Sequence, residues 1–168
     1  KMTKLLTLLG LFLLTSVCAQ QSDKMAIENL LNTWHQAAAS ADFDTYFGCM
    51  STSSVFVGTD ATEHWDKQEF MAFSKPYFDQ GKAWAFTPVE RHIYFSETGE
   101  AAWFDELLDT WMQLCRGSGV LVKEGGKWKI AHYVLSMTIP NEEVEGAISL
   151  KKDKDSTLKK SLLTRRTN

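Results

Sequence analysis

The sequence has little cysteine and none of the short motifs that mark common metal or cofactor sites. Its three cysteines form no C-x-x-C motif, H-E-x-x-H is missing, and His and Cys nowhere cluster, so no structural zinc site is expected. There is also no nucleophile elbow, phosphate-cradling glycine loop or dinucleotide fingerprint, and the Gly-Ser-Gly at 117–119 is too short to replace one. We therefore expect no cofactor and no metal.

Charge is spread unevenly along the chain. The net charge is −3, with +5 on residues 150–168 and +2 on residues 1–19, which leaves −10 for residues 20–149. The negative charge of residues 20–149 argues against nucleic-acid binding. Residues 143–168 are expected to form a charged, flexible C-terminal tail and not a membrane patch.

Residues 1–19 have the layout of a secretory signal peptide. The segment begins with two basic residues, Lys1 and Lys4. The apolar run of residues 5–14 follows, and small residues end the segment. The run is shorter than the roughly 20 residues that cross a bilayer. We expect cleavage after Ala19 and a periplasmic or secreted protein. A lipoprotein anchored through Cys18 is the alternative, and in that case alone is a membrane partner expected.

Residues 20–142 have the length of one domain. Its cysteines, Cys49 and Cys115, would lie in an oxidising compartment, which permits a disulfide but does not require one. The full chain has six tryptophans and ten phenylalanines, which are many for its length, and they fit either an aromatic-lined interior or ordinary core packing.

Helical patterns dominate the first half of this domain. Apolar residues recur at three- and four-residue steps over 27–41, which predicts an amphipathic helix capped by Ser22 or Asp23. A short second helix is predicted after Asp42. Brief strands follow, and Asp66 is predicted to cap a third helix that Pro76 and Gly81 bring to an end.

Strand patterns dominate the second half. Residues 82–97, 100–114, 117–124 and 127–140 are rich in aromatic and β-branched residues, and short turns join them, including a two-residue turn at Gly125-Gly126. Such strands build an antiparallel meander. The predicted fold class is α+β, with three N-terminal helices against a strongly curved antiparallel sheet.

The predicted order of helices and strands, together with several short sequence stretches, resembles the SnoaL-like branch of the nuclear transport factor 2-like superfamily. The supporting stretches are Gly58-Thr59-Asp60 with Glu63 and Trp65, Trp103-Phe104, and the closing strand from Trp128-Lys129-Ile130 to Ser136. The resemblance covers about residues 22–142. It implies a cone-shaped sheet around an apolar cavity, and a homodimer formed through the outer face of the sheet.

The resemblance leaves the activity open. Some relatives are isomerases, dehydratases, cyclases or epoxide hydrolases, and others have no demonstrated chemistry. Ketosteroid-isomerase-like members place a tyrosine on the first helix, where this chain has Trp34 and His35.

Four residues are candidate catalytic groups. A two-residue turn at Gly125-Gly126 would place Gly119 opposite His132, and strand alternation would then put His132 on the same face as Trp128 and Ile130. His132 is a candidate general base. Asp105 and Glu106 point to opposite faces, so one carboxylate lies inside in either case, and Arg116 is its candidate ion partner. For each of these four residues, the alternative is a purely structural role.

The candidate ligand-binding residues are mainly aromatic, because an apolar cavity is lined by such side chains. They are Trp34, Phe56, Glu63, Trp65, Phe73, Tyr77, Trp103 and Tyr133. Asp60, His64 and Asp66 lie near Glu63, but turn and capping roles explain the aspartates better than a metal site does.

Three functions fit these observations. The first is binding of a small, largely apolar molecule in the cone. The second is a cofactor-independent acid-base enzyme, namely a lyase, isomerase or hydrolase. The third is a dimeric interaction module whose cone is filled by its own core.

Overall fold

The computed structural model describes residues 2–165, and the side chains of residues 20–165. The chain divides into two compact units, at residues 1–137 and 138–168. The elements of the first unit are α1 (Met2–Ala39), α2 (Phe43–Gly48), β1 (Met50–Val57), β2 (His64–Asp66), α3 (Lys67–Asp79), β3 (Thr87–Phe95), β4 (Ala101–Thr110), β5 (Gln113–Glu124) and β6 (Lys127–Met137). The second unit contains a 3-10 turn (Asn141–Glu143) and α4 (Val144–Arg165).

The predicted stripe of the first helix packs into the core, but the helix does not begin where the sequence indicated. Ile27, Leu31 and Trp34 are buried at helical spacing. The predicted cap at Ser22 or Asp23 is wrong, because α1 is continuous through both residues. The carboxylate of Asp23 instead accepts hydrogen bonds from Trp128 Nε1 at 2.9 Å and Lys123 Nζ at 3.1 Å.

The predicted signal peptide coincides with the first half of α1, and the side chains of residues 2–19 lie outside the described part. Cleavage after Ala19 and lipidation of Cys18 therefore stay predictions. Within the part whose side chains are described, no helix has the length and apolarity needed to cross a membrane.

The caps of the next two helices are confirmed. Asp42 accepts the backbone N–H of Thr45 at 3.1 Å at the start of α2. Asp66 and Glu69 bond each other's backbone N–H groups at the start of α3, as a capping box requires. The prediction that Pro76 helps to end the helix is wrong, since α3 continues to Asp79.

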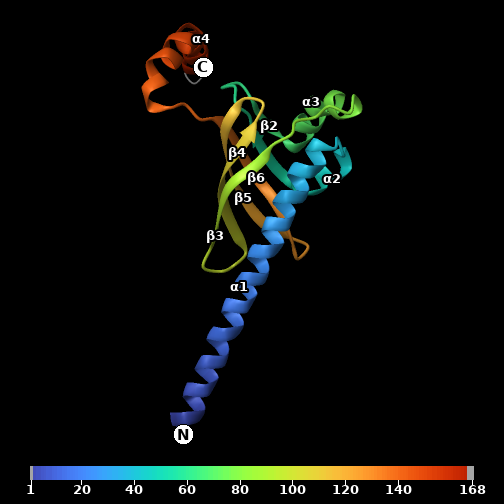
Figure 1. Ribbon diagram of the computed structural model, residues 1–168, viewed down its shortest axis with the longest axis vertical. Coiled ribbons are helices and arrows are strands. Elements are labelled where there is room, and N and C mark those ends of the chain that lie inside the picture. The colour runs from blue at the N-terminus through green and yellow to red at the C-terminus, as the bar shows by residue number, and fades with distance from the viewer. Residues whose placement is uncertain (1, 166–168) are drawn as a thin grey trace. The chain divides into compact units, whose positions relative to one another are not determined.

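Six strands form one curved, unclosed sheet, which confirms the predicted fold class. Its strand order is β2-β1-β6-β5-β4-β3, and neighbours are antiparallel except for β1 and β6, which are parallel. The parallel pair is possible because β1 and β6 are joined by a long connection, which contains β2, α3 and the strands β3, β4 and β5. The sheet curves alongside the C-terminal half of α1 (Figure 1). Cys49 and Cys115 are buried, free thiols.

Two tight turns connect the last three strands. The predicted turn at Gly125-Gly126 is confirmed: both glycines have positive φ, and Glu124 pairs with Lys127. The other turn was not predicted, because the sequence pattern predicts one strand over residues 100–114. That strand ends at Thr110, whose hydroxyl accepts the N–H of Met112 at 2.9 Å and donates to the carbonyl of Gln113 at 2.8 Å.

A bulge in β6 changes which side chains face inward. Leu121 pairs with Ile130, whereas the next residue back along β5, Val120, pairs with His132, so Ala131 is an extra residue. Trp128, Ile130, Tyr133 and Leu135 are consequently all buried, and His132 lies on the outer face. For this reason the prediction that Gly119 lies opposite His132, and that His132 shares a face with Trp128 and Ile130, is wrong; Gly119 pairs with Tyr133.

The second unit contains a helix, whereas the sequence predicts a flexible tail for residues 143–168. α4 has no buried residue and is rich in lysine. An ion pair at i,i+4, between Lys151 and Asp155 at 3.2 Å, lies along it.

Candidate ligand-binding site

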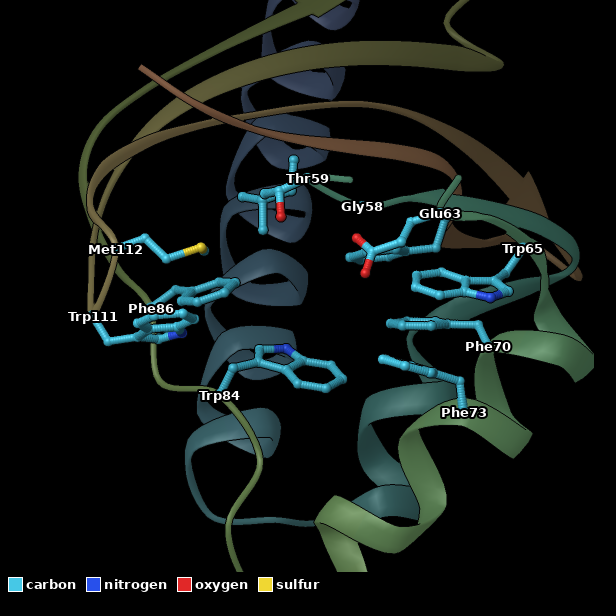
Figure 2. Close-up of a pocket in the computed structure, with 12 residues that line it drawn as sticks. Gly58, Thr59, Glu63, Trp65, Phe70, Phe73, Trp84, Phe86, Trp111 and Met112 are labelled. Atoms are coloured by element: carbon cyan, nitrogen blue, oxygen red, sulfur yellow. The ribbon is translucent and has the colours of Figure 1, made fainter. Parts of the chain in front are cut away.

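An apolar cavity of about 150 Å³ lies among the β1–β2 turn, α3, the segment before β3 and the β4–β5 turn. Figure 2 shows aromatic rings surrounding it on several sides. The lining residues are Phe56, Gly58, Thr59, Glu63, Trp65, Phe70, Phe73, Trp84, Phe86, Trp111, Met112 and Leu135.

Stacked rings form one wall of the cavity. Phe56 of β1 and Phe70 of α3 stack with centroids 4.0 Å apart, and Trp65 of β2 stacks on Phe73 at 4.5 Å. The capping box at Asp66 fixes where α3 begins and hence where Phe70 and Phe73 point. Because these rings brace one another, this wall is preformed.

The opposite wall comes from two short connections. Residues 82–86 have no regular structure and bring Trp84 and Phe86 to the cavity. The β4–β5 turn brings Trp111 and Met112, and Trp111 is 79% exposed at the rim. Solvent therefore reaches the cavity on the side of this turn.

Glu63 is the one ionisable side chain among the described residues that line the cavity. Its Oε2 accepts the backbone N–H of Asp60 at 3.1 Å, and the carboxylate points into the cavity (Figure 2). Gly58 makes this position possible, because a Cβ there would overlap Oε2 of Glu63. The β1–β2 turn thus holds one negative charge against an otherwise apolar, mainly aromatic surface.

A second polar centre, the Glu106 cluster, is buried between α1 and the sheet and comprises Glu106, His35, Arg91 and Tyr133. His35 Nε2 lies 2.8 Å from Oε1 of Glu106, and Tyr133 donates its hydroxyl to the same oxygen at 3.1 Å. Arg91 Nε donates to Oε2 at 2.9 Å. No member of the cluster lines the cavity.

The cluster keeps Glu106 ionised although the side chain has no exposed surface. Burial acts to raise the pKa of Glu106, but hydrogen bonding to His35 and the charges of His35 and Arg91 outweigh it, so the pKa lies below its usual value. The pKa of Tyr133 is raised well above its usual value, first by burial and then by the charge of Glu106. Tyr133 therefore stays a neutral donor.

The four predicted catalytic residues are not brought together. His132, Asp105 and Arg116 lie on the outer face of the sheet, where Asp105 is 3.3 Å from His92. Glu106 alone faces inward, and its histidine partner is His35 from α1. Because of the bulge in β6, His132 does not share a face with Glu106; the catalytic roles themselves stay predictions.

The predicted ligand-binding residues divide into three groups. Phe56, Glu63, Trp65 and Phe73 line the cavity, and their role in binding stays a prediction. Trp34 and Tyr133 are buried in the core behind it, with ring centroids 4.7 Å apart. Tyr77 is exposed beside Phe73 on α3, and Trp103 stacks on Tyr94 at 6.0 Å on the outer face of the sheet.

The predicted site residues include four of the twelve that line the cavity, and two of the four in the Glu106 cluster, where His35 and Arg91 were missed. The sequence pattern predicts Trp84 and Phe86 within one strand, and Trp111 and Met112 in the interior of another. One usable signal was strand alternation in β3. Arg91 lies two residues before Ile93 and four before Phe95, so the three share a face, and the two apolar residues mark that face as the inward one. For His35 the signal was its place beside Trp34 on the buried stripe of α1.

Comparisons with solved structures agree on the fold. An NTF2-like protein of unknown function from Pseudomonas putida KT2440 has a TM-score of 0.61 and 17% identity, covering 73% of this chain and 91% of that one. A proposed dehydratase of the NTF2-like family from Streptomyces avermitilis has a TM-score of 0.62 and 14% identity, over 72% and 99% of the two chains. The association domain of CaMKII from C. elegans has a TM-score of 0.58 and 22% identity, over 71% and 98%.

These likenesses show a shared fold and no more. Among curated proteins, none matches the sequence. A family model for the SnoaL-like domain matches residues 27–140, the stretch that contains the sheet, α2, α3 and the buried stripe of α1. The chain therefore belongs to the SnoaL-like domain family.

Proposed function

We propose that this protein binds a small, largely apolar molecule in the aromatic cavity. The observation that carries the proposal is the cavity wall itself, which takes seven aromatic side chains from five separate segments of the chain. Binding sites for small molecules are typically concave and apolar, with a few placed polar groups, and Glu63 is such a group here.

The size of the cavity limits the ligand. Its volume of about 150 Å³ is below the roughly 300–1,000 Å³ typical of sites for drug-sized molecules. A ligand of a few heavy atoms fits entirely, and a longer one would extend past Trp111 into solvent. Steroid-sized ligands are disfavoured unless the rim opens.

Intrinsic fluorescence tests the proposal, because Trp65, Trp84 and Trp111 line the cavity. We expect small aromatic or branched aliphatic compounds to change the emission saturably. Trp111→Ala should weaken binding, whereas the matched variant Trp103→Ala, which removes a tryptophan from the outer face, should not. Equal loss in both variants, or no saturable binding by any compound, would overturn the proposal.

The acid-base alternative has less support from the geometry. It requires a histidine and a carboxylate in contact with the ligand, and the pair that is formed, His35 and Glu106, lies outside the cavity lining.

We also propose export through the N-terminal segment and a homodimer formed through the outer face of the sheet. The dimer is supported by exposed Tyr94, Trp103 and Val120 on that face, and by the likeness to a domain named for association. Light scattering tests it: the native chain should have twice the monomer mass, and Val120→Lys should lower that mass. A monomeric native chain would contradict the dimer.

A further inference from the structure

We propose that the ligand of the cavity is an organic cation, and specifically that the site accepts an alkylammonium group between the Glu63 carboxylate and the aromatic rings. This inference rests on the proposed function and narrows it to one chemical class. It follows from two features that occur together at one place: a single carboxylate and a surrounding set of ring faces.

The charge of the cavity has one sign. Among its described lining residues, Glu63 is the one that ionises, and neither lysine, arginine nor histidine balances it there. An anionic ligand would meet this carboxylate and find no cation to pair with. The site is therefore selective against carboxylates and phosphates.

The aromatic rings add to this preference. The face of an aromatic ring carries negative electrostatic potential, and tryptophan attracts cations best. Trp65, Trp84 and Trp111 approach the cavity from three sides (Figure 2). An alkylammonium group combines the apolar surface that such walls favour with the charge that Glu63 requires.

A neutral apolar ligand fits the same space less well. It would cover the Glu63 carboxylate and remove its water without supplying a donor or a charge in return, which is costly. An alkylammonium ligand replaces that water with an ion pair. The net charge of −10 on residues 20–149 also raises the local concentration of cations around the domain.

The position of Glu63 is built into the turn. Asp60 donates its backbone N–H to Oε2, and the absence of a side chain at Gly58 leaves room for the carboxylate. One backbone hydrogen bond thus holds the carboxylate in the space that Gly58 leaves open.

A pair of probes with the same shape and different charge tests the inference. Choline carries a trimethylammonium group, and 3,3-dimethylbutan-1-ol is its uncharged carbon analogue. By titration calorimetry we expect the native chain to bind choline about tenfold more tightly than the alcohol. Glu63→Gln keeps the shape and the hydrogen bond from Asp60, and should remove most of this difference by weakening choline alone.

Glu97→Gln is the matched control, since Glu97 is an exposed carboxylate outside this cavity and the change is chemically the same. It should leave both affinities unchanged, and near-ultraviolet circular dichroism should show that both variants keep their core. Equal binding of the two probes, or an unchanged choline affinity in Glu63→Gln, would overturn the assignment of a cation while leaving the binding of apolar ligands standing. Binding of neither probe would contradict both proposals for ligands of this size.

Discussion

His35 Nε2 of α1 lies 2.8 Å from Oε1 of Glu106 on β4, although 71 residues separate them in the chain. The two side chains are 6% and 0% exposed. Because Arg91 and Tyr133 bond the same carboxylate, Glu106 joins α1, β3 and β6 at one point. The placement of the first helix against the sheet therefore depends on a buried charge.

Replacing Glu106 by glutamine should destabilise the fold strongly. The change removes the negative charge and leaves the guanidinium of Arg91, whose side chain is 10% exposed, without its counter-ion. Breaking one side of a buried ion pair costs about 3–5 kcal/mol. Urea denaturation of native and Glu106→Gln protein should show a loss of that order in the free energy of unfolding.

Asp105→Asn is the control for this experiment. Asp105 is the neighbouring residue on β4, it points to the outer face, and its contact with His92 is exposed to solvent. Exposed pairs contribute about 0–1 kcal/mol, so this variant should unfold close to the native protein. Similar losses in the two variants would mean that the Glu106 cluster has no special role.

Stability should fall in acid because of the same carboxylate. The pKa of Glu106 in the folded chain lies below its usual value of 4.5, so the unfolded chain takes up the proton first as the pH falls. The contribution of Glu106 is complete above about pH 4.5 and is lost progressively as the pH falls through the folded-state pKa. Denaturation at a series of pH values between 7 and 3 should show this loss, and Glu106→Gln should show a shallower decline.

Gly117 is required by the Glu106 cluster because of a close approach. A Cβ at this position would overlap the hydroxyl of Tyr133 and lie 2.8 Å from its Cζ. Gly117→Ala should therefore displace the ring and cost about 1–3 kcal/mol of stability. Gly48→Ala is the control, since nothing lies within 4 Å of a Cβ there.

Removing the hydroxyl of Tyr133 should relieve part of that cost. If the overlap is the cause, the double variant Gly117→Ala with Tyr133→Phe loses less stability than the sum of the two single variants. Thermal unfolding of the four proteins measures this coupling. Strict additivity would show that the strain at Gly117 lies elsewhere.

The fold was predictable from the sequence because its signals are local. Capping boxes, a two-glycine turn and helical periodicity each involve residues within a few positions, and the structure has these features at Asp66, at Gly125-Gly126 and over Ile27–Trp34. Two local devices carried no recognisable signal. The turn at Trp111-Met112 uses a threonine hydroxyl in place of Asn-Gly, and the bulge at Ala131 has no special residue.

The site was harder to predict because it depends on register and on an irregular segment. One extra residue in β6 moves His132 to the outer face and Tyr133 to the core, so a face assignment by alternation fails after Ile130. Residues 82–86 look strand-like by composition but follow Gly81 as an irregular connection, which brings Trp84 to the cavity. Glu63 and Trp65 both line the cavity, because Glu63 ends the β1–β2 turn and Trp65 lies in the short strand that follows it.

Processing of the N-terminus can be tested directly by intact mass. If the first nineteen residues are a signal peptide, the chain expressed in bacteria and collected outside the cytoplasm should begin at Gln20. A lipoprotein would instead begin at Cys18 and carry the added mass of its acyl chains. Ala19→Arg, which places a large residue next to the expected cut, should block release, and an unprocessed native chain would refute the signal peptide.

Gly58→Ala tests whether the position of the Glu63 carboxylate, and not its presence alone, determines cation binding. A Cβ at residue 58 would overlap Oε2 of Glu63 and lie 2.9 Å from its Cδ, so the carboxylate must move away from Asp60. The charge of the protein does not change, and neither does any aromatic wall residue. We expect choline affinity to fall by about tenfold, as in Glu63→Gln, with 3,3-dimethylbutan-1-ol less affected.

The control for this change is again Gly48→Ala, which lies outside the cavity lining and should bind choline as the native chain does. A normal choline affinity in Gly58→Ala, combined with a weakened one in Glu63→Gln, would mean that a mobile carboxylate suffices. The charge would then act at long range, and the geometry of the β1–β2 turn would not matter. If choline affinity falls in both variants, the carboxylate must stay where the turn holds it. A long-range attraction in water would be insensitive to a shift of this size.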